Sequence, residues 1–236
     1  LLQSSAASDV YKRQNLNQLI DSKNKLISLA SHQLKNPISS LMLASDSLEE
    51  DPEMIKVMKR STKHLADLVE QLKDFENLTA SKLILEAEDI DLSELVDKTI
   101  STFKAQSKKD KVTINTNLRP SLIIRGNKRH LKEAISNLIS NAIKYSKENK
   151  TVYIKTAKQK DKAVLTIKDN GIGIPKKEQK DIFTFGFRAS NTTNIEGNGF
   201  GMHLSKKVIE RHGGTLTLES EEDKGTIFTI EMGTIS

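Results

Sequence analysis

The first third of the chain repeats its apolar residues every seven positions, a pattern typical of long packed helices. One heptad column contains only apolar residues: Ile20, Ile27, Leu34, Leu41 and Leu48. From residue 16 to residue 50 there is no glycine, and Pro37 is the single proline. Asp51 and Pro52 then suit the start of a second helix, because aspartate caps helix N-termini and proline fits their first turn. We therefore predict an antiparallel helical hairpin over residues 15–86.

A single hairpin would leave much of these apolar seams uncovered. The second helix, which we expect to end near residue 83, has an apolar column of its own at Met58, Leu65 and Leu72. A second copy of the hairpin would complete a four-helix bundle, so we predict a homodimer. Residues 1–14 lack this period, and the chain opens on Leu1 rather than Met. We expect these residues to be the non-native or disordered tail of a fragment.

Residues 87–236 mix short strands with helices, which predicts a second domain. Asp91 and Glu94 resemble a capping box, with aspartate in the usual place of serine or threonine. Helices are expected at 91–107, at 128–146, as a short segment between two glycine-rich loops, and from the second of these loops to 212. Strands are expected at 112–118, 121–125, 151–156, 163–168, 215–219 and 226–231. Because the two element types do not alternate strictly, we predict an α/β sandwich of the α+β class rather than a doubly wound parallel sheet.

Composition narrows the functions open to this chain. Its 236 residues include no cysteine, which excludes disulfide scaffolds and cysteine-ligated zinc. No apolar run reaches eighteen residues, so we expect no membrane contact by this fragment. The net charge is +6, but basic and acidic residues are interspersed, aromatic residues make up 4%, and tryptophan is absent. These features argue against a nucleic-acid partner.

His32 is the first candidate for chemistry. Its heptad column is polar throughout, with Gln18, Lys25, His32, Ser39 and Asp46, so the imidazole is expected to face solvent. An ordinary surface histidine would explain this pattern. Pro37, however, loosens the helix close to His32. A solvent-facing imidazole that is partly neutral near pH 7 is also a usable nucleophile.

A polar stripe runs along the helix predicted at 128–146. Glu133, Asn137, Asn141 and Lys144 are spaced so that they share one helix face. Asparagine is a poor helix former, so two of them in mid-helix ask for a reason. Amide oxygens suit Mg²⁺ and lysine suits phosphate. On spacing alone, a solvated polar face explains the stripe at least as well.

Two glycine-rich segments follow in the second domain. Asp169 ends a predicted strand and precedes Gly171 and Gly173, where the backbone can approach a ligand closely. Its carboxylate could accept a hydrogen bond from an exocyclic amine such as that of adenine, although an ordinary tight turn would look similar. The segment 197–202 places glycines before a helix, which offers backbone N–H groups to an anion. It follows a loop rather than a strand, which does not fit a dinucleotide-binding fingerprint.

Taken together, these segments resemble the transmitter region of bacterial sensor histidine kinases, with the Bergerat-type ATP fold shared by gyrase, Hsp90 and MutL. The resemblance extends from about Asn15 to the end of the chain. Six segments match the family's motifs in order, namely 31–37 (the H box), 137–146 (the N box), 169–175 (the first glycine box), 182–188 (the phenylalanine box), 197–202 (the second glycine box) and 223–226 (a last short motif).

The resemblance implies a role for each motif. His32 would accept the phosphoryl group from ATP, and Asn141 would hold Mg²⁺ with the help of Asn137. Lys144 and Tyr145 would lie near the nucleotide, and Asp169 would read the adenine amine. The segment 186–198 would form a lid over ATP. The other residues assigned to the nucleotide pocket are Gly171, Gly173, Ile174, Phe187, Gly197, Gly199, Gly201, Met202 and Thr226.

The resemblance also implies partners and a location. The phosphoryl group would pass to an aspartate in the receiver domain of a response regulator, because no receiver pattern occurs in this chain. The upstream sensor segment would be missing from the sequence. A cytoplasmic location follows for this part, whether or not the parent protein is anchored to a membrane.

Two departures from the family pattern bear on activity. Gln33 stands where the family usually has glutamate or aspartate, and glutamine cannot take a proton from the imidazole. We therefore expect slow autophosphorylation. Gly186 stands where the phenylalanine box usually has its second phenylalanine, so Phe185 or Phe187 has to fill that place. Asn36 matches the position tied to phosphatase activity on the receiver.

Two other functions compete with a histidine kinase. One is a plain ATPase of the gyrase or Hsp90 type, which has a glutamate where Asn137 stands to activate water. The other is a nucleotide-binding dimeric phosphatase or docking module with weak kinase activity, for which Gln33 is the best support. Nucleotide binding without acid-labile phosphate on His32 would distinguish that module from a kinase.

Overall fold

The computed structural model describes residues 34, 37–41, 55, 57–58, 61–62, 65, 87–146, 150–193, 195, 197 and 199–235. The chain divides into two compact units, residues 1–74 and 75–236. Every described residue of the first unit is helical, which agrees with the helices predicted there. The tail 1–14 and the turn near Asp51 lie outside the described residues, and the boundary at 86/87 remains a prediction. Within the described residues, no helix combines the length and the apolar character needed to cross a membrane.

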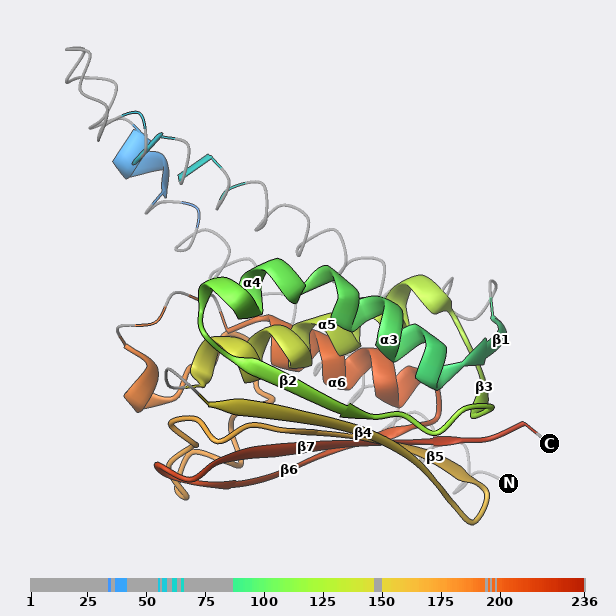
Figure 1. Ribbon diagram of the computed structural model, residues 1–236. Helices are drawn as coiled ribbons and strands as arrows, with labels where there is room; N and C mark the ends of the chain where they lie inside the picture. Colours follow the sequence, from blue (N-terminus) through green and yellow to red (C-terminus); the bar gives the residue numbers. More distant parts are fainter. Residues whose placement is uncertain are drawn as a thin grey trace, which may run out of the picture. The chain divides into compact units, whose positions relative to one another are not determined.

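The second unit has two layers, a five-stranded sheet and a layer of helices on one of its faces (Figure 1). In chain order the elements are β1 (Glu88–Asp91), α3 (Leu92–Thr102), α4 (Lys104–Lys109), β2 (Thr113–Asn117), β3 (Ile123–Gly126), α5 (Lys128–Tyr145), β4 (Thr151–Gln159), β5 (Lys162–Lys168), η2 (Ser190–Thr192), α6 (Gly201–Arg211), β6 (Thr215–Glu221) and β7 (Gly225–Gly233).

The strands follow the order β2-β4-β5-β7-β6, and only the β2–β4 pair is parallel. A separate antiparallel pair joins β1 to β3. This mixed sheet confirms the predicted α+β class and excludes a doubly wound parallel sheet.

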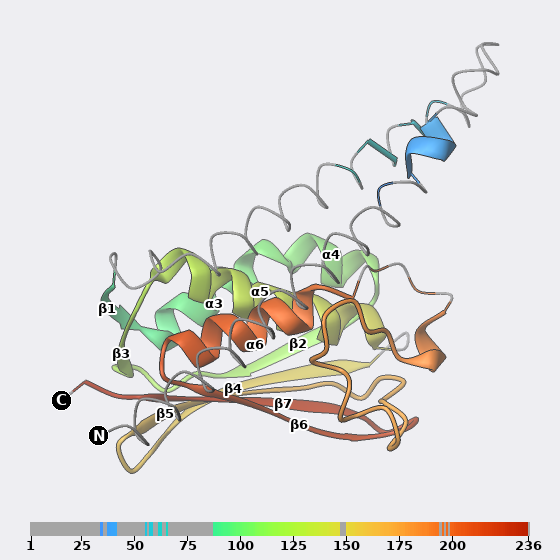
Figure 2. The ribbon, with the colours of Figure 1, turned by 180° about the vertical axis from the view of Figure 1, so that it is seen from behind.

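The core lies between the sheet and the helices. Along β4, Val152 and Ile154 are buried whereas Tyr153 is 45% exposed, as expected for a strand with one covered face. Ile154 pairs with Ile167, which pairs in turn with Phe228, so one buried row crosses β4, β5 and β7. Helix α5 contributes its apolar stripe to this core, with Leu131, Ala134, Ile135, Leu138, Ile139, Ala142 and Ile143 all buried. Figure 2 shows α5 and α6 side by side on the covered face of the sheet.

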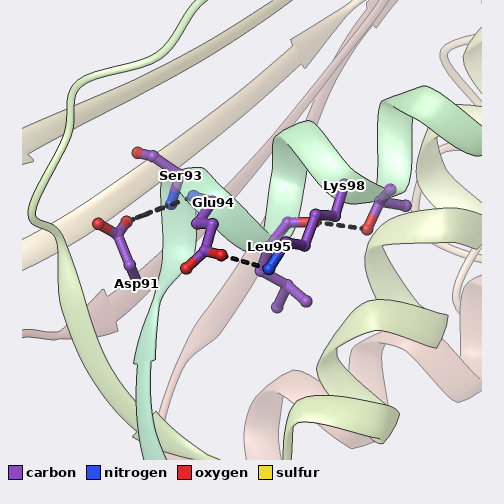
Figure 3. Close-up of polar contacts among 6 residues, drawn as sticks. Asp91, Ser93, Glu94, Leu95 and Lys98 are labelled. Atoms are coloured by element: carbon purple, nitrogen blue, oxygen red, sulfur yellow. Dashed lines mark hydrogen bonds and ion pairs between the residues drawn. The ribbon is translucent and has the colours of Figure 1, made fainter.

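Helix α3 begins at the predicted cap. Asp91 Oδ1 accepts hydrogen bonds from the backbone N–H groups of Ser93 at 2.9 Å and Glu94 at 3.4 Å (Figure 3). Glu94 does not complete the capping box but pairs with Lys98 one turn further along the helix. The other carboxylate oxygen of Asp91 accepts from the backbone of Ser121 at 3.0 Å, so the cap also anchors the loop before β3.

One strand was not predicted, and two predicted helices differ in the structure. Strand β1 was not predicted, because it has four mostly acidic residues and is paired only with β3. The helix predicted at 91–107 breaks at Phe103, whose N–H turns back to Ile100 O at 2.9 Å and divides the segment into α3 and α4. The short helix expected between the glycine-rich loops is a series of i→i+3 turns at 175–187 followed by η2.

Candidate functional site

The predicted phosphoacceptor segment can be followed only in part. His32, Gln33 and Asn36 lie outside the described residues, and their roles remain predictions. Leu34 and Pro37, which are described, are helical. The geometry of the candidate site therefore concerns the second unit.

Asp169 lies just beyond the end of β5 and is only 4% exposed. Its Oδ1 accepts backbone N–H groups from Gly171 at 2.8 Å and Thr226 at 3.2 Å. Burial raises the pKa of the Asp169 carboxyl from 3.8 to about 6, against the opposing effect of these backbone hydrogen bonds. Because both donors use Oδ1, the carboxylate is held with Oδ2 left to accept a hydrogen bond from a ligand.

The glycines after Asp169 allow backbone segments to pack closely. A Cβ on Gly171 would lie 2.2 Å from the carbonyl oxygen of Tyr145, the last residue of α5. Gly173 has a φ of +63°, and a Cβ there would lie 2.0 Å from the carbonyl oxygen of Glu221, the last residue of β6. No residue with a side chain fits either position without a backbone shift. The loop is thus held between the end of α5 and the β6–β7 turn.

Ile174 and Thr226 are both buried beside this loop. Ser220 joins them, because its Oγ accepts the backbone N–H of Ile174 at 2.9 Å and lies 3.0 Å from Thr226 Oγ1. Gln179 Nε2 donates to the carbonyl oxygens of Ile174 at 2.9 Å and Ser220 at 2.8 Å. Ser220 and Gln179 were not predicted from the sequence, because the hydrogen bonds that join them to each other and to Ile174 include two that span 46 and 41 residues.

A cationic group lies at the C-terminal end of α5. Lys144 Nζ lies 5.2 Å from the centroid of the Tyr145 ring and 3.0 Å from where a Cβ on Gly197 would stand, so glycine gives the lysine room. Burial is the main cause that lowers the pKa of Lys144, and the charge of Arg188 lowers it further. Burial raises the pKa of Tyr145, while Arg188 has the opposite effect.

The positive charges of Lys144 and Arg188 are therefore close enough to affect each other. Among the described residues, no carboxylate forms an ion pair with either. The Arg188 guanidinium donates to the carbonyl oxygens of Thr192, at 2.7 Å, and Ile195. Arg188 was not among the predicted site residues, although its place directly after Phe187 in the phenylalanine box was the signal that could have found it. Such a pair of cations suits a polyanionic ligand.

The two asparagines of the polar stripe face the first turn of α6. Asn141 Nδ2 lies 3.1 Å from Met202 Sδ, which leaves its Oδ1 available to a cation. A Cβ on Gly201 would lie 3.5 Å from Cγ of Asn137, in ordinary contact. The N-cap residue of α6, Phe200, makes no side-chain capping hydrogen bond, so backbone N–H groups there can meet an anion. In the part of the chain that is described, no cluster of three or more histidine, aspartate or glutamate side chains could hold a metal ion.

The phenylalanine box packs against this same helix end. Phe185 is buried and stacks on Phe200, with ring centroids 4.4 Å apart and planes inclined by 13°. Phe187 is only half-buried. Of the two residues proposed to replace the missing phenylalanine at 186, Phe185 is therefore the one that enters the core.

The start of the predicted lid is attached to the glycine loop. Ser190 donates its backbone N–H and its hydroxyl to the Glu178 carboxylate at 2.9 and 2.7 Å. These bonds lower the pKa of Glu178. Asn191 Nδ2 donates to the carbonyl oxygen of Gly173 at 3.0 Å. The first residues of the lid are thus tied to the loop that carries Asp169.

Two family models match the chain. Residues 22–81 match the His Kinase A (phospho-acceptor) domain, and residues 126–234 match the histidine kinase-, DNA gyrase B-, and HSP90-like ATPase. One match lies within each predicted domain, and the first match includes His32.

Similar proteins of known name agree with these matches. The chain is 31% identical to the sensor protein RprX of Bacteroides fragilis, over 91% of this chain and 44% of that protein. It is 28% identical to the circadian input-output histidine kinase CikA of Synechococcus elongatus, over 88% of this chain and 29% of that protein. The chain therefore spans less than half of either relative. The structure of histidine kinase ThkA in complex with response regulator protein TrrA shares the fold, with a TM-score of 0.76 at 20% identity over 93% of this chain and 64% of that one.

The tight packing at Gly173 leads to a stability prediction. Gly173 and Gly213 have similar φ values of +63° and +71°, but a Cβ on Gly213 would meet nothing within 4 Å. We expect Gly213→Ala to cost about 1 kcal/mol for its backbone conformation alone. Gly173→Ala should cost roughly 2 kcal/mol more, because its Cβ must displace Glu221. Urea unfolding of the two variants of the full chain measures this difference, and equal midpoints would contradict it.

Proposed function

The chain belongs to the sensor histidine kinases, as part of their transmitter region, and we propose that it transfers the γ-phosphoryl group of ATP to His32 and then to an aspartate of a response regulator. The observation that carries this proposal is the buried Asp169 carboxylate, which lies in the same domain as the cations Lys144 and Arg188. The Asp169 carboxylate suits a nucleobase amine, and the two cations suit phosphates. His32, within the segment that matches the phospho-acceptor domain, would receive the phosphoryl group.

Asp169 would identify adenine. Its Oδ1 is already engaged by the N–H groups of Gly171 and Thr226, so Oδ2 would accept the hydrogen bond of the exocyclic amine. Tyr145, Ile174 and the glycine loop would form the walls of the base pocket. Backbone contacts at Gly171 and Gly173 keep this loop in place before a ligand binds, which reduces the entropy lost on binding.

The phosphates would lie at the N-terminus of α6. Gly197, Gly199 and Gly201 would let the backbone approach them, and Met202 lines the same helix turn. Lys144 and Arg188 would supply positive charge, and half-burial of Lys144 in this region strengthens its attraction for an anion. Phe187, directly before Arg188, would close this side of the pocket.

The residues on α5 fit a magnesium ion. Asn141 presents an amide oxygen and Asn137 stands one turn before it on the same face, and Mg²⁺ takes such oxygens together with phosphate oxygens. When bound, the ion would neutralise charge on the phosphates. No carboxylate cluster among the described residues competes for that role.

The neutral imidazole of His32 would attack the γ-phosphorus. A nitrogen–phosphorus bond forms, the bond from phosphorus to the β,γ-bridging oxygen breaks, ADP leaves, and the imidazole proton is lost to solvent. Gln33 can accept a hydrogen bond from the ring but cannot take that proton. Positioning and charge neutralisation would therefore supply most of the rate.

The partners follow from the two domains. A second copy of the chain would complete the four-helix bundle, and a response regulator would accept the phosphoryl group. That the similar ThkA structure is a complex with a response regulator supports the second partner. We place the reaction in the cytoplasm, because it consumes ATP. Asn36 would allow the same chain to remove phosphate from the regulator.

One observation favours a second candidate. Gln33 removes the usual base beside the histidine, and a nucleotide-binding dimeric phosphatase or docking module with weak kinase activity would need no such base. This module differs from a kinase in leaving His32 unphosphorylated.

Incubation with Mg²⁺ and γ-labelled ATP tests the kinase directly. We expect the wild-type chain to acquire a label that survives alkali and is lost in acid, because phosphohistidine has this stability pattern. His32→Ala should remove the label, whereas His64→Ala, a control in the same predicted hairpin, should keep it. ATP binding without any label in wild type would favour the docking module instead.

A second experiment isolates the base. Gln33→Glu restores a carboxylate beside the imidazole, and general-base assistance contributes roughly 10²–10⁴-fold to such steps. We expect initial phosphorylation rates at saturating ATP to rise by about 10²-fold or more. Gln33→Ala serves as a control for the loss of packing. Equal rates for glutamine and glutamate would show that no base at this position limits the reaction.

Asp169→Asn tests adenine recognition. The amide can keep both hydrogen bonds to Oδ1 but turns a donor toward the adenine amine, so ATP affinity should fall by about 10²-fold. ITP, which carries an oxygen in place of that amine, should lose much less affinity. Calorimetric titration with ATP and with ITP measures how the ratio of the two affinities changes between wild type and Asp169→Asn. Unchanged discrimination between ATP and ITP would refute this role of Asp169.

The same carboxyl makes binding pH-dependent. Its pKa of about 6 lies above 3.8, so the acid form is common in the free site below pH 6. The adenine amine needs the ionised acceptor, and wild-type affinity for ATP should therefore decline as the pH falls through 6. In Asp169→Asn this decline should be absent.

A further inference from the structure

The first turns of α6 contact two functional segments at once. Met202 and Gly201 face the asparagines of α5. The next residue, His203, reaches the phenylalanine box instead, where its Nδ1 lies 2.9 Å from the carbonyl oxygen of Phe183. A carbonyl can only accept, so Nδ1 carries the proton of this hydrogen bond. Burial lowers the pKa of His203, which favours the neutral ring.

Four further contacts attach the phenylalanine box to α6 and to the two residues before it. The Phe185 ring stacks on Phe200 and meets the ring of His203 edge-on, with centroids 5.4 Å apart and planes at 86°. Gly186 N–H donates to the carbonyl oxygen of Gly199 at 3.1 Å. One turn further along α6, Lys206 Nζ lies 4.5 Å from the centroid of the Phe183 ring. The segment 183–186 is thus held at both ends. The His203 side chain holds Phe183, and a backbone hydrogen bond holds Gly186.

This attachment contributes to the position of Arg188, whose guanidinium is also held by the carbonyl oxygens of Thr192 and Ile195. Phe187 N–H donates to Thr184 O at 3.1 Å, so a tight turn carries the chain from the phenylalanine box directly to Arg188. The charge of Arg188 acts on both Lys144 and Tyr145. Movement of residues 183–186 away from α6 would therefore carry this cation away from Lys144.

We propose that His203 is a positioning residue for phosphate binding, whose Nδ1–H holds the Phe183 carbonyl and thereby the chain that carries Arg188. Neither the family matches nor the assigned motifs give His203 a role. The inference rests on the proposed nucleotide site. It predicts a defect confined to the phosphate end of the ligand, because Asp169 and its glycine loop bind the base from other elements.

The test compares two amides of similar chemistry at position 203. Asparagine places its side-chain nitrogen where Nδ1 of histidine stands, whereas the nitrogen of glutamine reaches the place of Nε2. Dissociation constants of the full chain are measured by calorimetry for ATP with Mg²⁺ and for adenosine, which lacks phosphates. His203→Asn should bind ATP within about twofold of wild type. His203→Gln should bind ATP about fivefold to tenfold more weakly, which corresponds to the net contribution of one hydrogen bond. Its affinity for adenosine should be unchanged.

Controls separate this role from a general loss of structure. Lys207→Ala, an exposed position on the same helix, should change neither constant. Thermal unfolding of each variant shows whether the domain is intact. Equal ATP affinities for His203→Asn and His203→Gln, or a parallel loss of adenosine and ATP affinity, would overturn the proposal. A wild-type chain that binds neither ligand would instead refute the nucleotide site itself.

Discussion

Burial of the Asp169 carboxylate constrains every segment around it. Raising the carboxyl pKa from 3.8 to about 6 corresponds to roughly 3 kcal/mol of unfavourable free energy when the group is ionised. The fold limits this cost with backbone donors from Gly171 and Thr226, and these donors can approach only because nearby residues lack side chains. At Gly225 a Cβ would lie 2.1 Å from the Asp169 carbonyl oxygen. The buried carboxylate destabilises the fold, and the glycines around it are needed to place its hydrogen-bond donors. Selection for stability alone would not favour this combination.

Apart from the two asparagines within α5, the remaining site residues lie at the ends of elements. Helix α5 supplies Lys144 and Tyr145 from its last turn, α6 supplies its first turn, and β5 ends next to Asp169. The packing of α5 along α6 sets the distance between the asparagines and the glycines. Rigid elements thus position groups that sit on irregular backbone, an arrangement that favours precise binding.

Periodic features of the fold could be predicted from the sequence, and contacts between distant segments could not. The apolar stripe of α5 repeats within a few residues, and the helix was predicted with nearly correct ends. The start of β4 was also predicted, although the strand continues three residues beyond the predicted end. The hydrogen bond from Ile174 to Ser220 spans 46 residues and follows no period. His203 likewise looked like an ordinary helix residue, because its partner in the phenylalanine box lies 20 residues earlier. The glycines in the sequence indicated where backbone segments come close together, but only the structure shows which atoms lie against each glycine.

The place of β7 in the sheet has a consequence for synthesis of the chain. This strand, Gly225–Gly233, lies between β5 and β6, although both precede it in the sequence. During translation, β6 and the edge of β5 that pairs with β7 stay unpaired until residues 225–233 leave the ribosome. Asp169 can accept the hydrogen bond from the Thr226 N–H group only after that point. A nascent chain that stalls before this strand would expose the edge of β5 and an unpaired β6 to chaperones or to neighbouring chains.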